Sequence, residues 1–565
     1  MRTLVQTGAL AAAGCTYRRN ELENLWEKPF RSVPDGSNLT HHVSPDLDAN
    51  IILRWGDPVL ENAPAWAPGK PNPEAQSLQF GYNNDYLALF ENGPDRFLLV
   101  ANHEYVNPEM MFAARHRGGN GSVAHQMAAV GLSVVELVRT GSSFVPTPSP
   151  LARRISATTP IELSGPAANS ALLCTSADSE GMKVLGTFGN CAGGVTPWGT
   201  VLSCEENFQS YFRYPEKKGP IARRYRLGSG RVQWHVVDSR FNYWYEPHES
   251  NRFGWVVEVD PWAPKAAPIK RTALGRFAHE SAELILSPDN RVVVYLGDDA
   301  PGEFLYRFVS DERWIGGQTG LQAGKILDSG TLSVAQFSHD GKVRWLPLRP
   351  GIGQLVQSNG FSSLADIVVN VRVAASLVGA TPLDRPEDVQ PLGEHVWVAL
   401  TGHGSRPIGQ KPVGSVVPFA RMGQILRLTS PDGDHTAEYF RWEVAISGGN
   451  VWKDSDLLAG PDNLAHDPGG RLLIATDQGR RKSETGSQDA LYRMDDQGRV
   501  MEEIFRGPLG SEICGPCLSP DNLGVWLSVQ HPGAGGTWSN PTTRWPDFDP
   551  SVPPRPAVVA LTPRS

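Results

Sequence analysis

A short apolar run that ends in polar residues recurs along this chain. Each run has the length of a typical β-strand, and turn sequences rich in Pro, Asp, Asn or Gly precede several of them. The runs are FLLVANHE (97–104), GTVLSCEE (199–206), VVVYLGDD (292–299), VWVALTGH (396–403), RLLIATDQ (471–478) and GVWLSVQH (524–531). Their repetition predicts small antiparallel sheets arranged around a common axis, as in a β-propeller of about six blades.

The spacing between these runs is irregular, from roughly 50 to 100 residues, so inserted segments are expected between the blades. Apolar positions at helical spacing predict helices in 125–140 and 361–380. The stretches 207–250 and 403–420 show no such period and predict long loops around the mouth of the propeller. The predicted fold is therefore all-β, a decorated β-propeller with inserted loops and small helical lobes.

The first residues, MRTLVQTGALAAAGC, have one Arg, a short run of small apolar residues and then Gly14 and Cys15. They resemble the tail of an export signal whose charged beginning lies upstream, and an ordinary N-terminal arm is the other interpretation. We expect such an arm over residues 1–45 and one propeller domain over residues 46–560.

Composition supports this fold and narrows the function. The 565 residues include 58 Gly, 46 Pro and 16 Trp, which favours short strands and turns over long helices. The net charge is -8 with no basic run, so nucleic-acid binding is not expected. No apolar stretch reaches the roughly 18 residues of a membrane-spanning helix. We expect a monomer.

Six cysteines are too few for a disulfide scaffold in a chain of this length. Cys514 and Cys517 enclose Gly-Pro, a spacing that redox proteins use where a helix follows a strand. Here a turn and another strand follow, which favours a structural or incidental pair over redox catalysis.

The polar ends of the runs could converge at the central channel of a propeller. Carboxylate and amide oxygens are the ligands that calcium prefers. The candidates of this kind are Asn102, Glu104, Asp298, Asp299, Asp462, Asn463 and Asp477.

Cys204 departs from that pattern because it lies directly before Glu205 and Glu206. Sulfur favours a softer or redox-active metal, and carboxylates favour ferric iron or other hard ions. Two-residue alternation would put Cys204 and Glu206 on one strand face, and a bulge would let Glu205 join them. The stretch predicts a mixed iron site.

Two further stretches supply candidates. RFAHES places His279 next to Glu280, and DRPEDV places Arg385 two residues before Glu387. An Arg side chain can bind phosphate with two parallel hydrogen bonds, and Glu387 would then coordinate a nearby metal. A surface salt-bridge turn is the alternative for Arg385.

Longer motifs in the same order resemble the PhoX-type alkaline phosphatases, over about residues 50 to 550. They are FGYNNDYLALF (80–90), ANHEYVNPEMMF (101–112), GNCAGGVTPWGTVLSCEENF (189–208), RFGWVVEVDP (252–261), GRFAHES (275–281), YLGDDAPGEFLYRFVS (295–310), DRPED (384–388), PDNLAHDPGGRLLIATD (461–477) and GPCLSPD with VQHPG (515–533). The CEENF and GDD–GEFLYRF blocks are the most specific.

This resemblance implies a bacterial propeller enzyme, exported to the periplasm or secreted by the twin-arginine route, that releases phosphate from small phosphate monoesters. It also implies a pair of oxo-bridged ferric ions with about three calcium ions, one iron bearing a Cys thiolate, and a metal-bound oxide or hydroxide as nucleophile. By position, Cys204 matches the thiolate and Arg385 the phosphate-binding Arg. The matching carboxylates are Glu205, Glu206, Glu280 and Glu387. Of the calcium candidates named above from the residues alone, Glu104, Asp298, Asp299 and Asp462 are predicted as further metal ligands.

Two other classes of function stay open. A propeller could use calcium structurally and bind a partner without catalysis, but a structural calcium site has no use for the Cys204 thiolate. A calcium-dependent lactonase-like hydrolase would have an acyl substrate and less need of Arg385. Elemental analysis would separate these alternatives.

Overall fold

The structure, a computed structural model, describes residue 26 and residues 28–228, 232–402, 414–449, 451–452, 456–479, 482–494 and 501–564. The segment interpreted as an export-signal remnant, including Cys15, lies outside the described residues, as does His403 at the end of the fourth apolar run.

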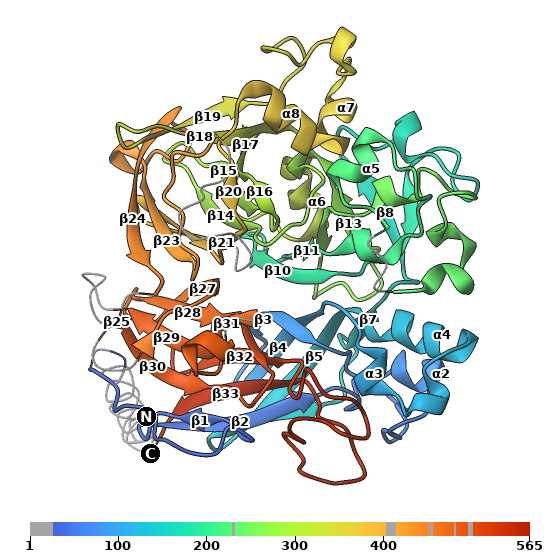
Figure 1. The fold of residues 1–565 in the computed structure, drawn as a ribbon, viewed down its shortest axis with the longest axis vertical. Coiled ribbons are helices and arrows are strands. Elements are labelled where there is room, and N and C mark those ends of the chain that lie inside the picture. The colour runs from blue at the N-terminus through green and yellow to red at the C-terminus, as the bar shows by residue number, and fades with distance from the viewer. Residues whose placement is uncertain are drawn as a thin grey trace, which may run out of the picture.

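Six blades surround a common centre, and their strands pair antiparallel except for one parallel pair, β13 (Ile269–Arg271) with β8 (Pro160–Ser164), in the second blade (Figure 1). The inner strand of each blade contacts the inner strands of the two neighbouring blades, so these strands close into a ring. The inner strands, from the first blade to the sixth, are β3 (Asn84–Glu91), β10 (Asn190–Val195), β14 (Glu283–Leu286), β21 (Pro386–Leu392), β27 (Pro461–His466) and β31 (Glu512–Leu518).

A second strand pairs antiparallel with each inner strand. The second strands are β4 (Arg96–His103), β11 (Val201–Glu205), β15 (Arg291–Gly297), β22 (His395–Leu400), β28 (Leu472–Thr476) and β32 (Val525–Gln530). They coincide with the six apolar runs, which confirms the predicted all-β propeller.

Further strands complete the blades toward the outside. They are β5 (Gly131–Thr140), β6 (Ser143–Thr147) and β7 (Arg153–Ile155) in the first blade; β12 (Val256–Val259), β13 (Ile269–Arg271), β8 (Pro160–Ser164) and β9 (Lys183–Leu185) in the second; β17 (Leu305–Arg313), β18 (Gly330–Phe337) and β19 (Lys342–Pro347) in the third; β23 (Gln424–Thr429) and β24 (Tyr439–Ser447) in the fourth; β29 (Ala490–Met494), β30 (Met501–Arg506) and β1 (His42–Val43) in the fifth; and β33 (Ala557–Pro563) with β2 (Leu47–Arg54) in the sixth. Two small pairs lie apart, β16 (Pro301–Glu303) with β20 (Leu383–Asp384) and β25 (Val451–Trp452) with β26 (Asp456–Leu457).

The ring is closed by strands from opposite parts of the chain. β2 forms the outer edge of the sixth blade, next to β33, which follows β32 in sequence. β1 likewise pairs with β30 at the edge of the fifth blade. The outer strands β19 and β24 pair with each other, so the third and fourth blades share one continuous sheet. Radial repetition of this kind leaves only short strand edges at the outside of the blades.

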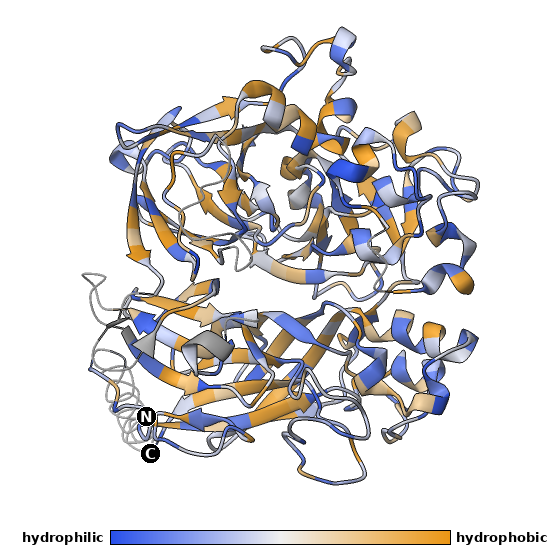
Figure 2. Cartoon of the chain, in the orientation of Figure 1, coloured by the Kyte–Doolittle hydropathy of each residue, from blue (hydrophilic) through white to orange (hydrophobic). Residues whose placement is uncertain are grey.

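Six apolar clusters fill the six spaces between neighbouring blades. Alternate residues of one strand pack into two different clusters: on β4, Leu98 and Val100 face the second blade, and Phe97 and Leu99 face the sixth. Because both strand faces are buried, the runs are apolar throughout and do not alternate. Figure 2 accordingly shows hydrophobic colour concentrated on the blade strands.

Helices are short and lie in the inserted segments. They are α2 (Pro73–Gln76), α3 (Pro108–Met111), α4 (Asn120–Ala129), α5 (Pro220–Arg224), α6 (Gly320–Ala323), α7 (Leu364–Val369), α8 (Val371–Val378) and α9 (Lys482–Thr485), with 3-10 turns η1 (Ala114–His116), η2 (Ala171–Leu173), η3 (Phe208–Tyr211), η4 (Trp234–Val236), η5 (Ser239–Phe241), η6 (Glu249–Arg252), η7 (Thr272–Leu274), η8 (Gly324–Asp328), η9 (Gln357–Asn359) and η10 (Pro431–Gly433). The predicted helix at 361–380 is confirmed as α7 and α8.

The helix predicted over 125–140 is wrong in its second half. α4 ends at Ala129, and the next residues form β5, which pairs with β4. Gly131 sets the boundary: its φ is +95°, and a Cβ there would lie 2.1 Å from the carbonyl oxygen of Ile155. Sheet pairing therefore overrides the helical spacing of the apolar residues.

Candidate metal centre and active site

Bulges at the starts of the inner strands create a polar end to the central channel. The register shifts in five inner strands, between residues 84 and 87, 190 and 193, 386 and 389, 461 and 464, and 514 and 517. A bulge bends its strand and re-aims side chains. Because the pairing is antiparallel, these starts lie beside the polar ends of the second strands.

Carboxylates and thiols from all six blades meet there. Among the described residues, five groups of three each offer ligand atoms that lie within 4.8 Å of one another. The groups are Asp85–Glu104–Cys191, Asp85–Glu512–Cys514, Cys191–Glu206–Glu280, Glu280–Asp299–Glu387 and Asp462–Asp477–Glu512. Four residues belong to two groups each, so the five groups form one connected carboxylate–thiol network.

The network is mostly buried and is short of hydrogen-bond donors. One carboxylate oxygen of each of Asp85, Glu206, Glu280 and Glu387 is buried without a hydrogen-bond partner. Burial, together with the charges of neighbouring carboxylates, raises the pKa of each of these groups well above its usual range. Unpaired buried carboxylates are costly, and bound cations remove that cost. The donor set therefore fits metal ions.

The structure brings together most of the site residues predicted from the sequence. Glu104, Glu206, Glu280, Glu387, Asp299 and Asp462 all belong to the network, each from the end of a second strand or the start of an inner strand. Asp477, also a candidate, joins Asp462. Cys204, Glu205 and Asp298 lie outside all five groups.

Cys204 packs in the apolar cluster between the second and third blades, beside Leu202 and Val256. Alternation along β11 puts it on the same face as Leu202. The strand ends at Glu205, so alternation does not extend to Glu206, which lies beyond it. The register shift in this blade is on β10, where it re-aims Cys191.

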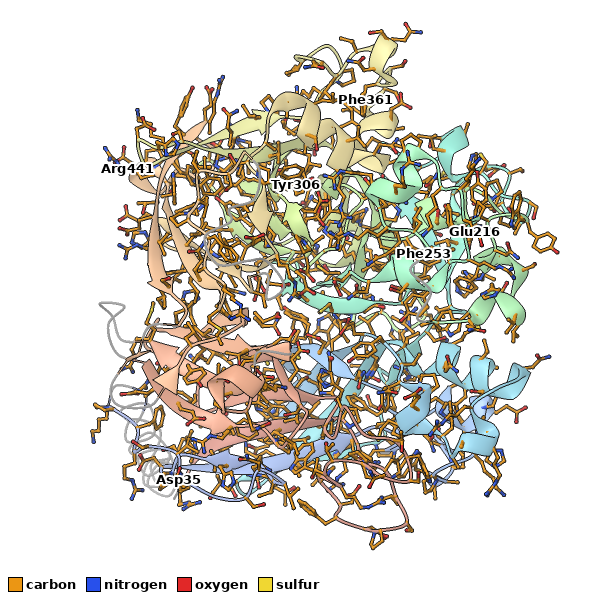
Figure 3. The ribbon with its side chains drawn as sticks, in the orientation of Figure 1. Asp35, Glu216, Phe253, Tyr306, Phe361 and Arg441 are labelled. Atoms are coloured by element: carbon orange, nitrogen blue, oxygen red, sulfur yellow. The ribbon has the colours of Figure 1, made fainter. Side chains whose placement is uncertain are left out.

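Glu205 is held by a fully buried ion pair. Its Oε1 accepts a hydrogen bond of 2.6 Å from Lys270 Nζ, and its Oε2 accepts from the backbone N–H groups of Gly254 and Trp255. Lys270 Nζ also lies 3.9 Å from the ring centroid of Phe253, labelled in Figure 3. These contacts anchor the end of β11 and leave Glu205 turned away from the network.

Replacing Lys270 by Met should lower the free energy of unfolding by about 3–5 kcal/mol, because it leaves Glu205 buried without its counter-charge. Denaturant unfolding measures this. Arg427→Met, which breaks a surface pair with Glu443, is the control and should cost less than about 1 kcal/mol. A Lys270→Met loss no larger than the control would show that the buried pair contributes little.

Asp298 pairs with a different cation. Its Oδ2 accepts a hydrogen bond of 2.9 Å from Arg372 Nε, and its Oδ1 accepts from the N–H of Ala278. His279 stacks on Phe277, with ring centroids 3.7 Å apart, and burial lowers its pKa to about 3. Both residues hold the loop that leads to Glu280.

The two Asn candidates act as supports. Asn102 Nδ2 donates to the carbonyls of Cys191 and Ala192 at 2.7 and 3.0 Å, so it holds the bulge that carries the thiol. Asn463 Oδ1 accepts from the N–H of Gly515 at 2.9 Å and ties β27 to β31. Their amide groups position backbone at the network.

Arg385 projects a guanidinium at the edge of the network. It donates to both oxygens of Asp299, at 2.7 and 2.9 Å, and its Nη2 lies 2.8 Å from Glu387 Oε1. Its backbone φ is +59°, a strained conformation for a residue with a Cβ, and its side chain is 26% exposed. The partly exposed guanidinium of Arg385 is thus paired with two carboxylates of the network.

Four network residues were not among the candidates chosen from the sequence: Asp85, Cys191, Glu512 and Cys514. Each lies at the start of an inner strand, and the second strand of the same hairpin carries the next polar run. Two of them lie in motifs already noted, NNDYLALF and GNCAGGV. Antiparallel pairing was the signal that could have found them, because the end of one strand lies beside the start of its partner.

Further along the inner strands, Glu283 and Asp388 line a cavity of about 400 Å³. Burial raises the pKa of Glu283 to about 8, with a contribution from Asp388, and burial raises the pKa of Asp388 to about 6. A carboxylic acid whose pKa is raised by folding contributes its full stabilisation below its unfolded-state pKa. That stabilisation is lost as the pH rises through its folded-state pKa.

Glu283→Gln should therefore become progressively more stable relative to the unsubstituted protein between about pH 4.5 and about pH 8. The expected gain at the upper end is on the order of 2–4 kcal/mol. Unfolding free energies measured across this range test it, with pH 4 as the internal reference. A difference that does not change with pH would contradict the raised pKa.

A closed propeller whose channel carries buried, mutually close carboxylates and thiols defines the class of protein as a metal-binding β-propeller. A family model described as "Alkaline phosphatase PhoX" matches residues 28–533. The chain therefore belongs to the PhoX alkaline phosphatase family.

The solved structure of Pseudomonas fluorescens PhoX in complex with vanadate, a transition-state analogue, is 36% identical, with a TM-score of 0.88 over 95% of this chain and 98% of that one. A protein of unknown function from Dyadobacter fermentans has a TM-score of 0.39 at 10% identity, over 92% and 100% of the two chains. The periplasmic gluconolactonase PpgL of Pseudomonas aeruginosa has 0.35 at 9% identity, over 91% and 99%. Similarity this low carries no argument about function, and no curated protein matches the sequence.

The predicted enzyme class is confirmed: the protein is a hydrolase of phosphate monoesters and belongs to a family of metalloenzymes. In the part of the chain that the structure describes, no helix is long and apolar enough to cross a membrane.

Proposed function

We propose that this phosphatase works at a mixed iron–calcium centre held by the carboxylate–thiol network. The observation that supports it best is the set of buried carboxylate oxygens without partners, three of which belong to residues grouped with the Cys191 thiol: Asp85, Glu206 and Glu280. Cys191 takes the role that the family resemblance assigned to Cys204. We propose further that residues 46–560 form one catalytic domain, and that the enzyme is monomeric and exported to the periplasm or secreted by the twin-arginine route.

Donor chemistry suggests how the ions divide. The groups that contain Cys191 combine sulfur with carboxylates, which suits iron, and they include Glu104, Glu206 and Glu280. The all-oxygen groups Glu280–Asp299–Glu387 and Asp462–Asp477–Glu512 suit calcium. When bound, the ions neutralise the phosphate oxygens and the leaving alkoxide and supply an activated water-derived nucleophile.

The residues of the chain then orient the substrate and hold the charges in place. Arg385 can donate hydrogen bonds to phosphate from the exposed side of its guanidinium, while Asp299 fixes that guanidinium from the other side. Asn207 donates to the Glu206 carboxylate, and Gln530 donates to both Asp85 and Glu104. Most of the network side chains are buried, and these low-dielectric surroundings strengthen the charge interactions among them.

The variants Cys191→Ala and Cys204→Ala, compared with each other, test this assignment. We expect protein produced with iron and calcium to contain both metals and to show a thiolate-to-iron absorption band. Cys191→Ala should lose that band and part of the iron, because the sulfur is a ligand. Cys204→Ala should keep both, because Cys204 packs among apolar side chains.

Visible spectroscopy and elemental analysis of both variants supply the measurement. Loss of the band in Cys204→Ala instead would restore the original assignment of Cys204. A colourless, active protein that contains only calcium would rule out iron altogether.

A further inference from the structure

We propose that Asp85, Glu512 and Cys514 form a second thiolate-bearing metal position, next to the one at Cys191, that takes a thiophilic transition-metal ion such as Zn²⁺ or iron. Ligand atoms of these three residues lie within 4.8 Å of one another. The inference does not require that the Cys191 position holds iron, only that a cation occupies the Cys514 group.

The fold holds Cys514 firmly in this position. Its side chain is fully buried, and its Sγ lies 3.3 Å from Glu512 Oε1 on the same strand. The next residue, Gly515, lies in the β31 bulge with a φ of +50°. A Cβ at Gly515 would lie 2.4 Å from the carbonyl oxygen of Asp85, so only glycine lets β31 approach β3 this closely.

Asp85 connects the two thiols. Its side chain is 1% exposed, and its Oδ2 accepts hydrogen bonds from Gln530 Nε2 at 2.6 Å and from Cys191 Sγ at 3.4 Å. Its Oδ1 is buried without a partner. One carboxylate oxygen thus faces Cys191 while the other is unpaired, and a carboxylate so placed can bridge two ions, one beside each thiol.

The sequence motif around Cys514 agrees with a ligand better than with a redox pair. Cys514 pairs with Ser528 and Cys517 pairs with Trp526, on opposite sides of the bulge. Cys517 is a free thiol that packs against the apolar cluster between the sixth and first blades. The two sulfurs of Cys514-Gly-Pro-Cys517 therefore lie in different environments, one polar and one apolar.

Thiolate sulfur with two carboxylates selects a transition metal over calcium. Binding breaks the S–H bond of Cys514 and forms a metal–sulfur bond, and the proton passes to water with no change of oxidation state. The second position would add one more transition-metal ion to the network.

The test uses full-length protein produced with iron, zinc and calcium. Elemental analysis counts transition-metal ions, and X-ray absorption at each metal edge detects metal–sulfur scattering. Cys514→Ser should lose about one transition-metal equivalent per chain and part of the metal–sulfur scattering. Cys517→Ser is the matched control from the same motif and should keep both.

Cys191→Ser supplies a test that does not depend on the folding of the Cys514 variant. It should retain metal–sulfur scattering, because Cys514 still holds an ion. Complete loss of that scattering in Cys191→Ser, or unchanged metal and scattering in a folded Cys514→Ser, would overturn the second position. If Cys514→Ser lost all metal–sulfur scattering and Cys191→Ser kept it unchanged, the second position would be supported. The proposed role of Cys191 would then be rejected.

Discussion

Glu280→Gln should lower kcat/KM for a phosphate monoester by about 10³-fold or more, because one preorganised charge already contributes about 10²–10³-fold and this change also removes metal. Glu280 belongs to two groups of the network, one with Cys191 and Glu206 and one with Asp299 and Glu387. The neutral amide can replace only one of the carboxylate's contacts. Kinetics and elemental analysis on the same preparation measure both losses.

Glu283→Gln is the matched control, because Glu283 lies only three residues further along, belongs to none of the five groups, and lines a cavity that Asp85 borders only as one lining residue. It should keep the metal content and the activity of the unsubstituted protein at the assay pH. If Glu280→Gln kept its metals and lost only activity, Glu280 would act on the substrate and not as a ligand. Full activity in Glu280→Gln would place the catalytic centre elsewhere.

Arg385→Lys should lower kcat/KM about 30- to 1000-fold. This corresponds to a loss of roughly 2–4 kcal/mol of transition-state stabilisation, comparable to the loss of an electrostatic donor. Lysine keeps the positive charge but has no planar fork, so it cannot hold Asp299 with two parallel bonds and also reach phosphate. Lysine and arginine both carry a Cβ, so the backbone strain at the φ of +59° is the same in the two proteins and does not contribute to the difference. Phosphomonoesterase kinetics measure the effect.

Metal content separates the two roles that Arg385 could have. It should stay unchanged in Arg385→Lys, because the guanidinium is not a metal ligand, and it should fall in Glu387→Gln. Arg427→Lys, in an exposed pair on β23, is the control and should be fully active. Loss of metal in Arg385→Lys would make Arg385 a structural residue that organises Asp299 and Glu387.

Local patterns determined the fold class and one strand of each blade. The six apolar runs are the second strands, and they could be found because each is buried on both faces and ends at a turn. Their polar ends predicted Glu104, Glu206, Asp299 and Asp477 of the network, since a propeller brings equivalent strand ends to one face.

The tertiary structure alone decided which polar residue at a strand end faces the channel. Cys204 and Glu205 are neighbours in sequence, yet one packs between blades and the other pairs with Lys270 on β13. Cys191 and Cys514 enter the network through bulges at the starts of inner strands. A bulge depends on pairing with a strand elsewhere in the chain, and a one-residue change of register moves a side chain to the opposite face. The sequence by itself determined that thiol and carboxylates would meet, and the register of the paired strands determined which thiol.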